Sequence, residues 1–328
     1  MKLLKLVPDH TNIHFLRWRV PFYVMSFLMM AASIGLIATK GLNLGVDFVG
    51  GQVIRVTFAE GTEAPVGPLR TEIEKLGYGE PIIQRFGKAN EISIRMKLPE
   101  GADKNPKLSD AMAGKITSDI RSHHSDARID GVDSVSGKVS GELGHSAMLA
   151  LGLAALAVAA YIWIRFEWQF GVGALFSLVH DVTLTLGMFA LTQMEFDLNI
   201  VAALLTLIGY SLNDTIVVYD RIRENMKKYR KMPMPELLDL SVNETLARTI
   251  VTSLSMLITL VALLLMGPDV IFGFTSAIVL GIFVGTYSSI YMAAPILIWL
   301  GVNSESFVKT ESEIDRQERL ARERGARP

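Results

Sequence analysis

Six long apolar runs constrain this 328-residue chain more than any other feature of its sequence. Half of the residues are apolar, and a soluble protein of this size does not gather them in blocks of about 20 residues. A helix of that length rises about 30 Å, which is the thickness of a hydrocarbon core. We therefore predict an α-helical membrane protein with six transmembrane helices, at residues 20–39, 145–164, 170–192, 196–219, 247–266 and 271–300.

The basic residues between these runs indicate orientation, because cytoplasmic loops carry an excess of Lys and Arg. If residues 1–19 are cytoplasmic, that side also receives the six basic residues of 221–231 and those of 301–328. The short outer loops at 193–197 and 267–269 contain neither Lys nor Arg. We expect both termini in the cytoplasm, with a solvated helical or disordered tail; attraction of the tail to anionic membrane lipid is the alternative.

Residues 40–144 then lie outside as one compact α+β domain, before the bundle of helices in 145–300. The period-two and helical patterns follow the order β-α-β-β-α-β, which is ferredoxin-like and assigns no chemistry by itself. His123 and His124 end the second helix, and we expect both to be exposed without a ligand role. Strands are predicted near 52–58, 81–86, 91–98 and 128–139, and helices near 64–76 and 109–123.

Asp214 and Arg248 stand in otherwise apolar runs, where an ionisable side chain costs several kcal/mol unless it is paired or hydrated. Asp214 lies about five residues before the inner end of its run, roughly 7–8 Å deep, and Arg248 begins the next run at the same side. We therefore predict an Asp214–Arg248 pair. The alternatives are that Arg248 snorkels to the headgroups as an anchor and that Asp214 is purely structural.

Helical spacing places more polar side chains on the same faces as these groups. Asp181 is a third ionisable side chain in an apolar run, either part of a proton relay with Asp214 and Arg248 or a hydrogen-bonded helix contact tied to His180. We predict that Tyr210, Asn213, Thr252 and Ser255 support the relay. The three stripes are Thr206, Tyr210, Asn213 and Asp214; Arg248, Thr252, Ser255 and Thr259; and Ser177, Asp181 and Thr185.

A buried carboxyl group can drive transport if it gains and loses a proton. Burial favours the neutral form of such a group, and a nearby guanidinium favours the charged form. An arginine that moves relative to Asp214 would therefore change how tightly this side chain holds a proton. The sequence thus predicts a conformational cycle driven by a proton gradient, with protons as the coupling ion.

The last run contains a small residue at every fourth position, which lets a second helix approach closely in lipid. The neighbour belongs either to this chain or to a partner. The stripe consists of Gly273, Ala277, Gly281, Gly285 and Ser289.

Composition and motifs argue against several function classes. The chain has no cysteine, which excludes disulfides, thiolate catalysis and cysteine metal sites. Its net charge of −1 gives no reason to expect a nucleic-acid partner. Walker A, zinc and nucleophile-elbow signatures are absent, and the glycines of 45–51 lack dinucleotide-binding spacing. We expect that the protein is not an enzyme and that it binds no cofactor or metal.

Motifs spread over nearly the whole chain resemble the SecF family of protein-export membrane subunits. Residues 136–140 depart from the Val-Gly-Pro turn that is usual there. The matching segments are 45–51 (GVDFVGG), 141–143 (GEL), 180–181 (HD), 213–215 (NDT), 221–225 (RIREN), 243–249 (NETLART) and 285–290 (GTYSSI) with Pro295.

This resemblance implies half of an RND-type transporter, which forms twelve membrane helices together with SecD. It further implies work with the SecYEG–SecA translocon in the cell inner membrane, using the proton gradient to complete preprotein export. The α+β domain would be periplasmic and would handle the emerging polypeptide. The family's relay aspartate and arginine map onto Asp214 and Arg248. The alternatives are an RND-type exporter half for a small solute or lipid, and an assembly scaffold without a transport cycle.

Overall fold

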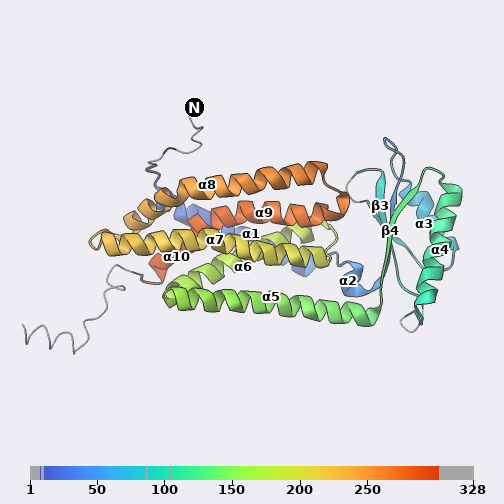
Figure 1. The fold of residues 1–328 in the computed structure, drawn as a ribbon, viewed down its shortest axis with the longest axis horizontal. Helices are drawn as coiled ribbons and strands as arrows, with labels where there is room; N and C mark the ends of the chain where they lie inside the picture. The colour runs from blue at the N-terminus through green and yellow to red at the C-terminus, as the bar shows by residue number, and fades with distance from the viewer. Residues whose placement is uncertain (1–7, 9–10, 86–87, 100, 103–104, 303–328) are drawn as a thin grey trace, which may run out of the picture.

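The computed structural model describes residues 8, 11–85, 88–99, 101–102 and 105–302. The predicted cytoplasmic tail therefore lies almost entirely outside the described residues. A bundle of long helices forms one end of the molecule, and a small α+β domain forms the other (Figure 1). The two parts are connected by the segment that follows α1 (Arg19–Lys40) and by the beginning of α5 (Gly137–Arg165).

The prediction of six membrane-spanning helices is confirmed, since six helices in the described part of the chain are long and apolar enough to cross a membrane. Helices α1 and α5 are two of these spans. The short 3₁₀ turn η2 (Asp269–Ile271) precedes the last span. That span is α9 (Phe272–Ser288), continued by the π-helical segment η3 (Ser289–Ala293) and by α10 (Ala294–Trp299). The other three spans are α6 (Trp168–Thr192), α7 (Leu198–Lys228) and α8 (Met234–Met266).

Several predicted helix ends are wrong. Helix α5 begins at Gly137 instead of 145, α7 continues to Lys228 instead of 219, and α8 begins at Met234 instead of 247. The extensions of α7 and α8 are amphipathic, so their mean hydropathy falls below that of a membrane run while one face stays buried. Their buried apolar side chains are Ile222, Met226, Leu237, Leu238 and Val242.

The ferredoxin-like order of the α+β domain is confirmed. Its sheet has the strand order β2-β3-β1-β4, and every neighbouring pair is antiparallel. Both helices cover the face of the sheet that points away from the bundle (Figure 1). Ile54, Ile92 and Ile94 pack there against Ile73 and Ile116. The elements are β1 (Gly51–Thr57), α3 (Val66–Lys75), β2 (Ile82–Arg85), β3 (Glu91–Met96), α4 (Pro106–His123) and β4 (Arg128–Val135).

A short segment after α1 fastens this domain to the bundle. The Arg95 side chain of β3 donates to Leu44 O at 2.7 Å and to Asn43 Oδ1 at 2.5 Å. Gly45 N then donates to Phe196 O, and Phe196 N donates to Asn43 O, both at 2.8 Å. The turn α2 (Val46–Val49) follows and leads into β1. The loop between α6 and α7 thus becomes the surface on which the domain sits.

Candidate functional site

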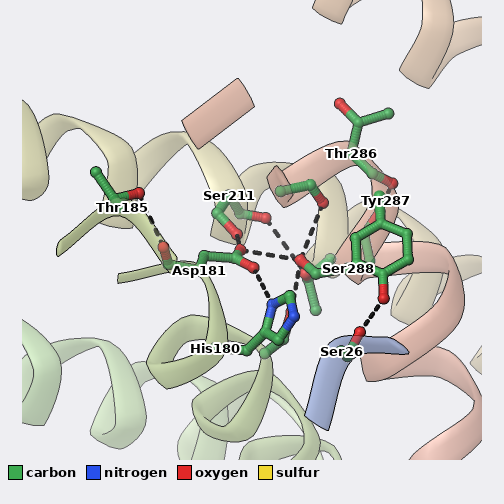
Figure 2. Close-up of polar contacts among 12 residues, drawn as sticks. Ser26, His180, Asp181, Thr185, Ser211, Thr286, Tyr287 and Ser288 are labelled. Atoms are coloured by element: carbon green, nitrogen blue, oxygen red, sulfur yellow. Dashed lines mark hydrogen bonds and ion pairs between the residues drawn. The ribbon is translucent and has the colours of Figure 1, made fainter. Parts of the chain in front are cut away.

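Asp181 stands at the meeting point of α6, α7 and α9, and it is fully buried. The Nδ1 atom of His180 lies 2.9 Å from its Oδ1 atom. Ser211 and Ser288 donate hydroxyl hydrogen bonds to its Oδ2 atom at 2.5 Å and 2.9 Å (Figure 2). Ser177 in turn donates to Ser288 at 3.0 Å. The carboxylate is therefore held by donors from three helices, as a buried charge requires.

Small residues on α9 let α7 come close enough for these bonds. A Cβ atom on Gly285 would lie 3.3 Å from the Ser211 side chain, and one on Gly273 would lie 3.1 Å from Ile200. A Cβ atom on Gly281 would collide with Leu207. The neighbour of the small-residue stripe is thus α7 of the same chain. Ala277 and Ser289 complete the stripe and are buried.

Asp214 is also buried, with 3 % of its surface exposed, but its surroundings differ. Its Oδ2 atom has no hydrogen-bond partner among the described residues. Ser253 and Arg248 act on the carboxylate electrostatically. Ser253 also contacts Thr286 at 2.8 Å and accepts from the Tyr210 hydroxyl at 3.2 Å. Asp214 therefore lies at the edge of a hydroxyl cluster formed by α7, α8 and α9.

Arg248 does not form the predicted pair in this structure. Its side chain is exposed, and no ion pair within 4.0 Å joins it to Asp214 in the described part of the chain. It is the fifteenth residue of α8, which begins at Met234, so the expectation that Arg248 opens its helix is wrong. The guanidinium nevertheless stays within electrostatic range of the carboxylate.

The structure divides the predicted supporting residues into two groups. Tyr210 contacts the cluster beside Asp214, and Thr252 is half-buried and donates to its own backbone at Arg248 O. Asn213 and Ser255 are exposed on the outside of the bundle. Successive helical residues differ by about 100° in direction, so Asn213 and Asp214 cannot both point inward.

Sequence reasoning missed the serines and the threonine that complete both clusters: Ser211, Ser253, Thr286 and Ser288. One signal was available for Ser211, which lies three residues before Asp214 and hence on a neighbouring face of α7. For the others, the sequence does not say which helices are adjacent.

The loop between α6 and α7 forms a second polar region, where it faces the sheet. A cavity of about 420 Å³ is lined there by Arg55, Ser93, Glu195 and Phe272, among other residues. Burial raises the pKa of the Glu195 carboxyl group, and this effect exceeds the lowering effect of Arg95. Burial likewise raises the pKa of Asp197, against a hydrogen bond from the Ile200 backbone.

The expectation for His124 is wrong, whereas His123 is exposed as predicted. The His124 side chain is 17 % exposed, its Nε2 atom lies 3.0 Å from Glu72 Oε2, and its ring meets Phe58 edge-on. Glu72, Asp119 and His123 place one potential metal-ligand atom each within 4.8 Å of one another. This group is partly exposed, and the region that the structure describes offers nothing further that points to an ion there.

Comparison with known proteins decides the family. The profile described as "Protein export membrane protein SecD/SecF, C-terminal" matches residues 115–303, and "SecD/SecF GG Motif" matches residues 35–61. The protein translocase subunit SecF of Rhodobacter capsulatus is 43 % identical over 319 residues, covering 94 % of this chain and 95 % of the relative. The chain belongs to the SecF family. The SecF subunit of Vibrio alginolyticus is 39 % identical over 311 residues, covering 95 % and 97 %.

A solved structure agrees with this SecF assignment. The crystal structure of SecDF, a translocon-associated membrane protein from Thermus thermophilus, matches with a TM-score of 0.81 and 32 % identity. The match covers 90 % of this chain and 40 % of the Thermus chain. The SecF-family chain thus spans well under half of that protein.

Proposed function

We propose that this member of a protein-export family is a proton-motive-force-driven accessory subunit of the Sec translocase. In this proposal it acts with SecD, beside SecYEG and SecA, to promote preprotein export across the cell inner membrane. The coupling ion is the proton, and neither a bound cofactor nor hydrolytic or redox chemistry is required. The names of its relatives support the translocase role; the proton coupling rests on the residues described above.

Asp214 is the single observation that supports proton coupling most directly. A buried charged carboxylate is costly unless it is paired, and no described residue donates a hydrogen bond to Asp214 Oδ2. Arg248 lies within electrostatic range but forms no ion pair with any residue that the structure describes, so a rotation of its flexible side chain would change the electrostatic field at Asp214. Burial without a partner favours the neutral form of a carboxyl group, and a closed pair with a guanidinium favours the charged form. Two such states are what a proton-driven cycle needs.

The outward surface of α7 and α8 supports a second membrane subunit as partner. The Asn213 amide and the Arg248 guanidinium are exposed there, and neither has a hydrogen-bond partner among the described residues. Lipid chains offer no hydrogen bonds to such groups. The matching Thermus structure is named SecDF and is much longer than this chain, which favours SecD as the subunit that covers this surface.

The distribution of charge favours cytoplasmic termini and a periplasmic α+β domain. Basic residues gather at the bundle end farther from that domain, at the turn between α5 and α6 and between α7 and α8 (Figure 1). By the positive-inside rule this end faces the cytoplasm. The domain would then meet the preprotein where it leaves the translocon.

The test compares Asp214→Asn with Asp220→Asn, a matched change on the same helix at an exposed aspartate that pairs with Arg165. Each variant is coexpressed with SecD, and both proton flux and preprotein export are measured in membrane vesicles. We expect Asp214→Asn to lower both rates by roughly 100-fold, because a positioned proton carrier contributes at least that much. Asp220→Asn should leave them unchanged. Full flux and export in Asp214→Asn, with normal insertion, would contradict the proposal.

A further inference from the structure

We propose that His180 and Asp181 form a second proton-binding site, whose proton is held on His180 Nε2 and whose occupancy depends on the charge of Asp214. This inference rests on the proposed function, which it extends from one acidic group to two coupled groups. It gives His180 a role that the relay of Asp214 and Arg248 does not include.

The Nε2 atom of His180 is the observation that points to a ligand. The residue is fully buried, and Nε2 has no hydrogen-bond partner among the described residues. The other ring nitrogen, Nδ1, is engaged with the Asp181 carboxylate at 2.9 Å. A neutral imidazole that donates from Nδ1 leaves a lone pair on Nε2. This nitrogen is therefore an unused base inside the bundle.

The partners of Asp181 determine where a proton goes. Its carboxylate already accepts from Ser211 and Ser288, in addition to His180. Hydrogen bonds of this kind stabilise the charged form of a carboxylate. The next proton adds to His180, where a new N–H bond forms on Nε2. The dyad changes from a net charge of −1 to a neutral pair of imidazolium and carboxylate, and a low-dielectric interior favours that neutral total.

Asp214 is placed to influence this step. It lies three residues after Ser211 on α7, about 4.5 Å along the helix axis from the residue that contacts Asp181. A negative charge on Asp214 favours proton uptake by the dyad, and a neutral Asp214 disfavours it. For unit charges roughly 10 Å apart at an effective dielectric constant of about 20, the effect on proton affinity is about tenfold.

Other titratable groups around α6 contribute less. On α9, the Tyr287 ring lies 5.8 Å from the His180 ring, and its hydroxyl contacts Ser26 of α1 and donates to Phe22 O (Figure 2). Tyrosines stay neutral near neutral pH, so they do not compete for the proton. Besides Asp214 and Tyr287, the titratable groups on the elements packed against α6 are Arg19, Tyr23 and Lys40 on α1; Lys138, Glu142, His145, Tyr161 and Arg165 on α5; Tyr210, Tyr219, Asp220, Arg221, Arg223, Glu224, Lys227 and Lys228 on α7; and Tyr291 on η3.

The direct test follows the His180 ring by nitrogen NMR, using the full chain labelled with ¹⁵N-histidine in lipid nanodiscs and coexpressed with SecD. The chain has six histidines, and His180→Gln identifies the signals of this one. We expect Nε2 to pass from unprotonated to protonated between about pH 8 and 5. In Asp214→Asn the midpoint of the same transition should require an about tenfold higher proton concentration. The matched control His145→Gln, at an exposed histidine of α5, should leave it unchanged.

A His180 ring that keeps one neutral tautomer over the whole pH range would overturn the inference. A transition whose midpoint is the same in Asp214→Asn as in the unmodified protein would also overturn it. Asp181→Glu should retain the transition, because it keeps a carboxylate beside Nδ1; this variant also separates proton binding from simple packing. If Asp214→Asn abolishes proton flux while His180 never titrates, the dyad fails and the proposed function stands. Full flux in Asp214→Asn defeats the proposed function, whatever His180 does.

Discussion

Replacing Arg95 by Gln should release the α+β domain from the bundle without unfolding either part. The guanidinium donates to Leu44 O at 2.7 Å, to Asn43 Oδ1 at 2.5 Å and to Gln84 Oε1 at 3.0 Å, and the residue is only 8 % exposed. A glutamine amide can replace one of these bonds. Two charge-assisted bonds are then lost, and their acceptors are left partly buried.

The expected cost is about 2–4 kcal/mol, since hydrogen bonds to charged groups contribute about 1.5–3 kcal/mol each and the acceptors regain some water. At 1.4 kcal/mol for each factor of ten, local opening becomes roughly 30- to 1000-fold more frequent. The amides of Gly45 and Phe196 report this opening, because both are hydrogen-bonded across the junction. Hydrogen exchange measured by mass spectrometry on the full chain reads them directly.

Arg128→Gln is the matched control, because Arg128 lies on the same sheet with its side chain 77 % exposed. We expect its exchange at Gly45 and Phe196 to match that of the unmodified protein. A change of less than about threefold in Arg95→Gln would refute the reasoning, because it would correspond to well under 1 kcal/mol. The junction would then depend on apolar packing instead of the guanidinium.

Two further predictions concern single groups. Tyr219→Phe should lower the free energy of unfolding in detergent by about 1–2 kcal/mol, because the buried hydroxyl donates to Ala293 O at 3.0 Å. The control Tyr161→Phe, at an exposed tyrosine, should change this free energy by less than about 0.5 kcal/mol. Equal changes in the two variants would contradict a stabilising role for the Tyr219 hydrogen bond. Burial raises the pKa of Glu195, so its carboxyl group holds a proton more tightly in the docked junction than in the open one. The docked junction therefore loses stability, and hydrogen exchange at Phe196 should speed up, as the pH rises above 4.5, the ordinary pKa of a glutamate. After the rates are corrected for intrinsic exchange, Glu195→Gln should reduce their dependence on pH and leave the part that is due to Asp197. An unchanged dependence on pH would count against the burial argument.

Most of the fold could be predicted from local patterns. Each membrane helix is specified by its own apolar block, and the α+β domain by alternation between period-two and helical segments. The ends of α7 and α8 could not be placed this way. Residues 220–228 are polar on average, and 234–246 mix polar and apolar residues in about equal numbers; both are helical because Ile222 and Leu237 share a core at the far end of the bundle. That is a tertiary effect, which hydropathy averages do not contain.

The site could be predicted only in part. The cost of a charge at membrane depth identifies Asp181 and Asp214 as buried, and both are. The orientation of their neighbours depends on which helices pack together, so Asn213 was expected inside and Ser253 was not expected at all. Arg248 illustrates the same limit, because its depth was inferred from a helix start that the structure places 13 residues earlier than residue 247, at Met234.

The contrast between the two acids argues for different roles. Asp181 has hydrogen-bond donors on both oxygens, so its carboxylate is stable without help from outside the bundle. Among the described residues Asp214 Oδ2 has no hydrogen-bond partner, and the cation that acts on its carboxylate, Arg248, stands exposed at the surface where we propose that SecD binds. A partner that repositions Arg248 would therefore act on Asp214 first. It would reach Asp181 through the charge of Asp214 and the Ser211 hydroxyl, which makes Asp214 a point where partner contact and proton binding can be linked.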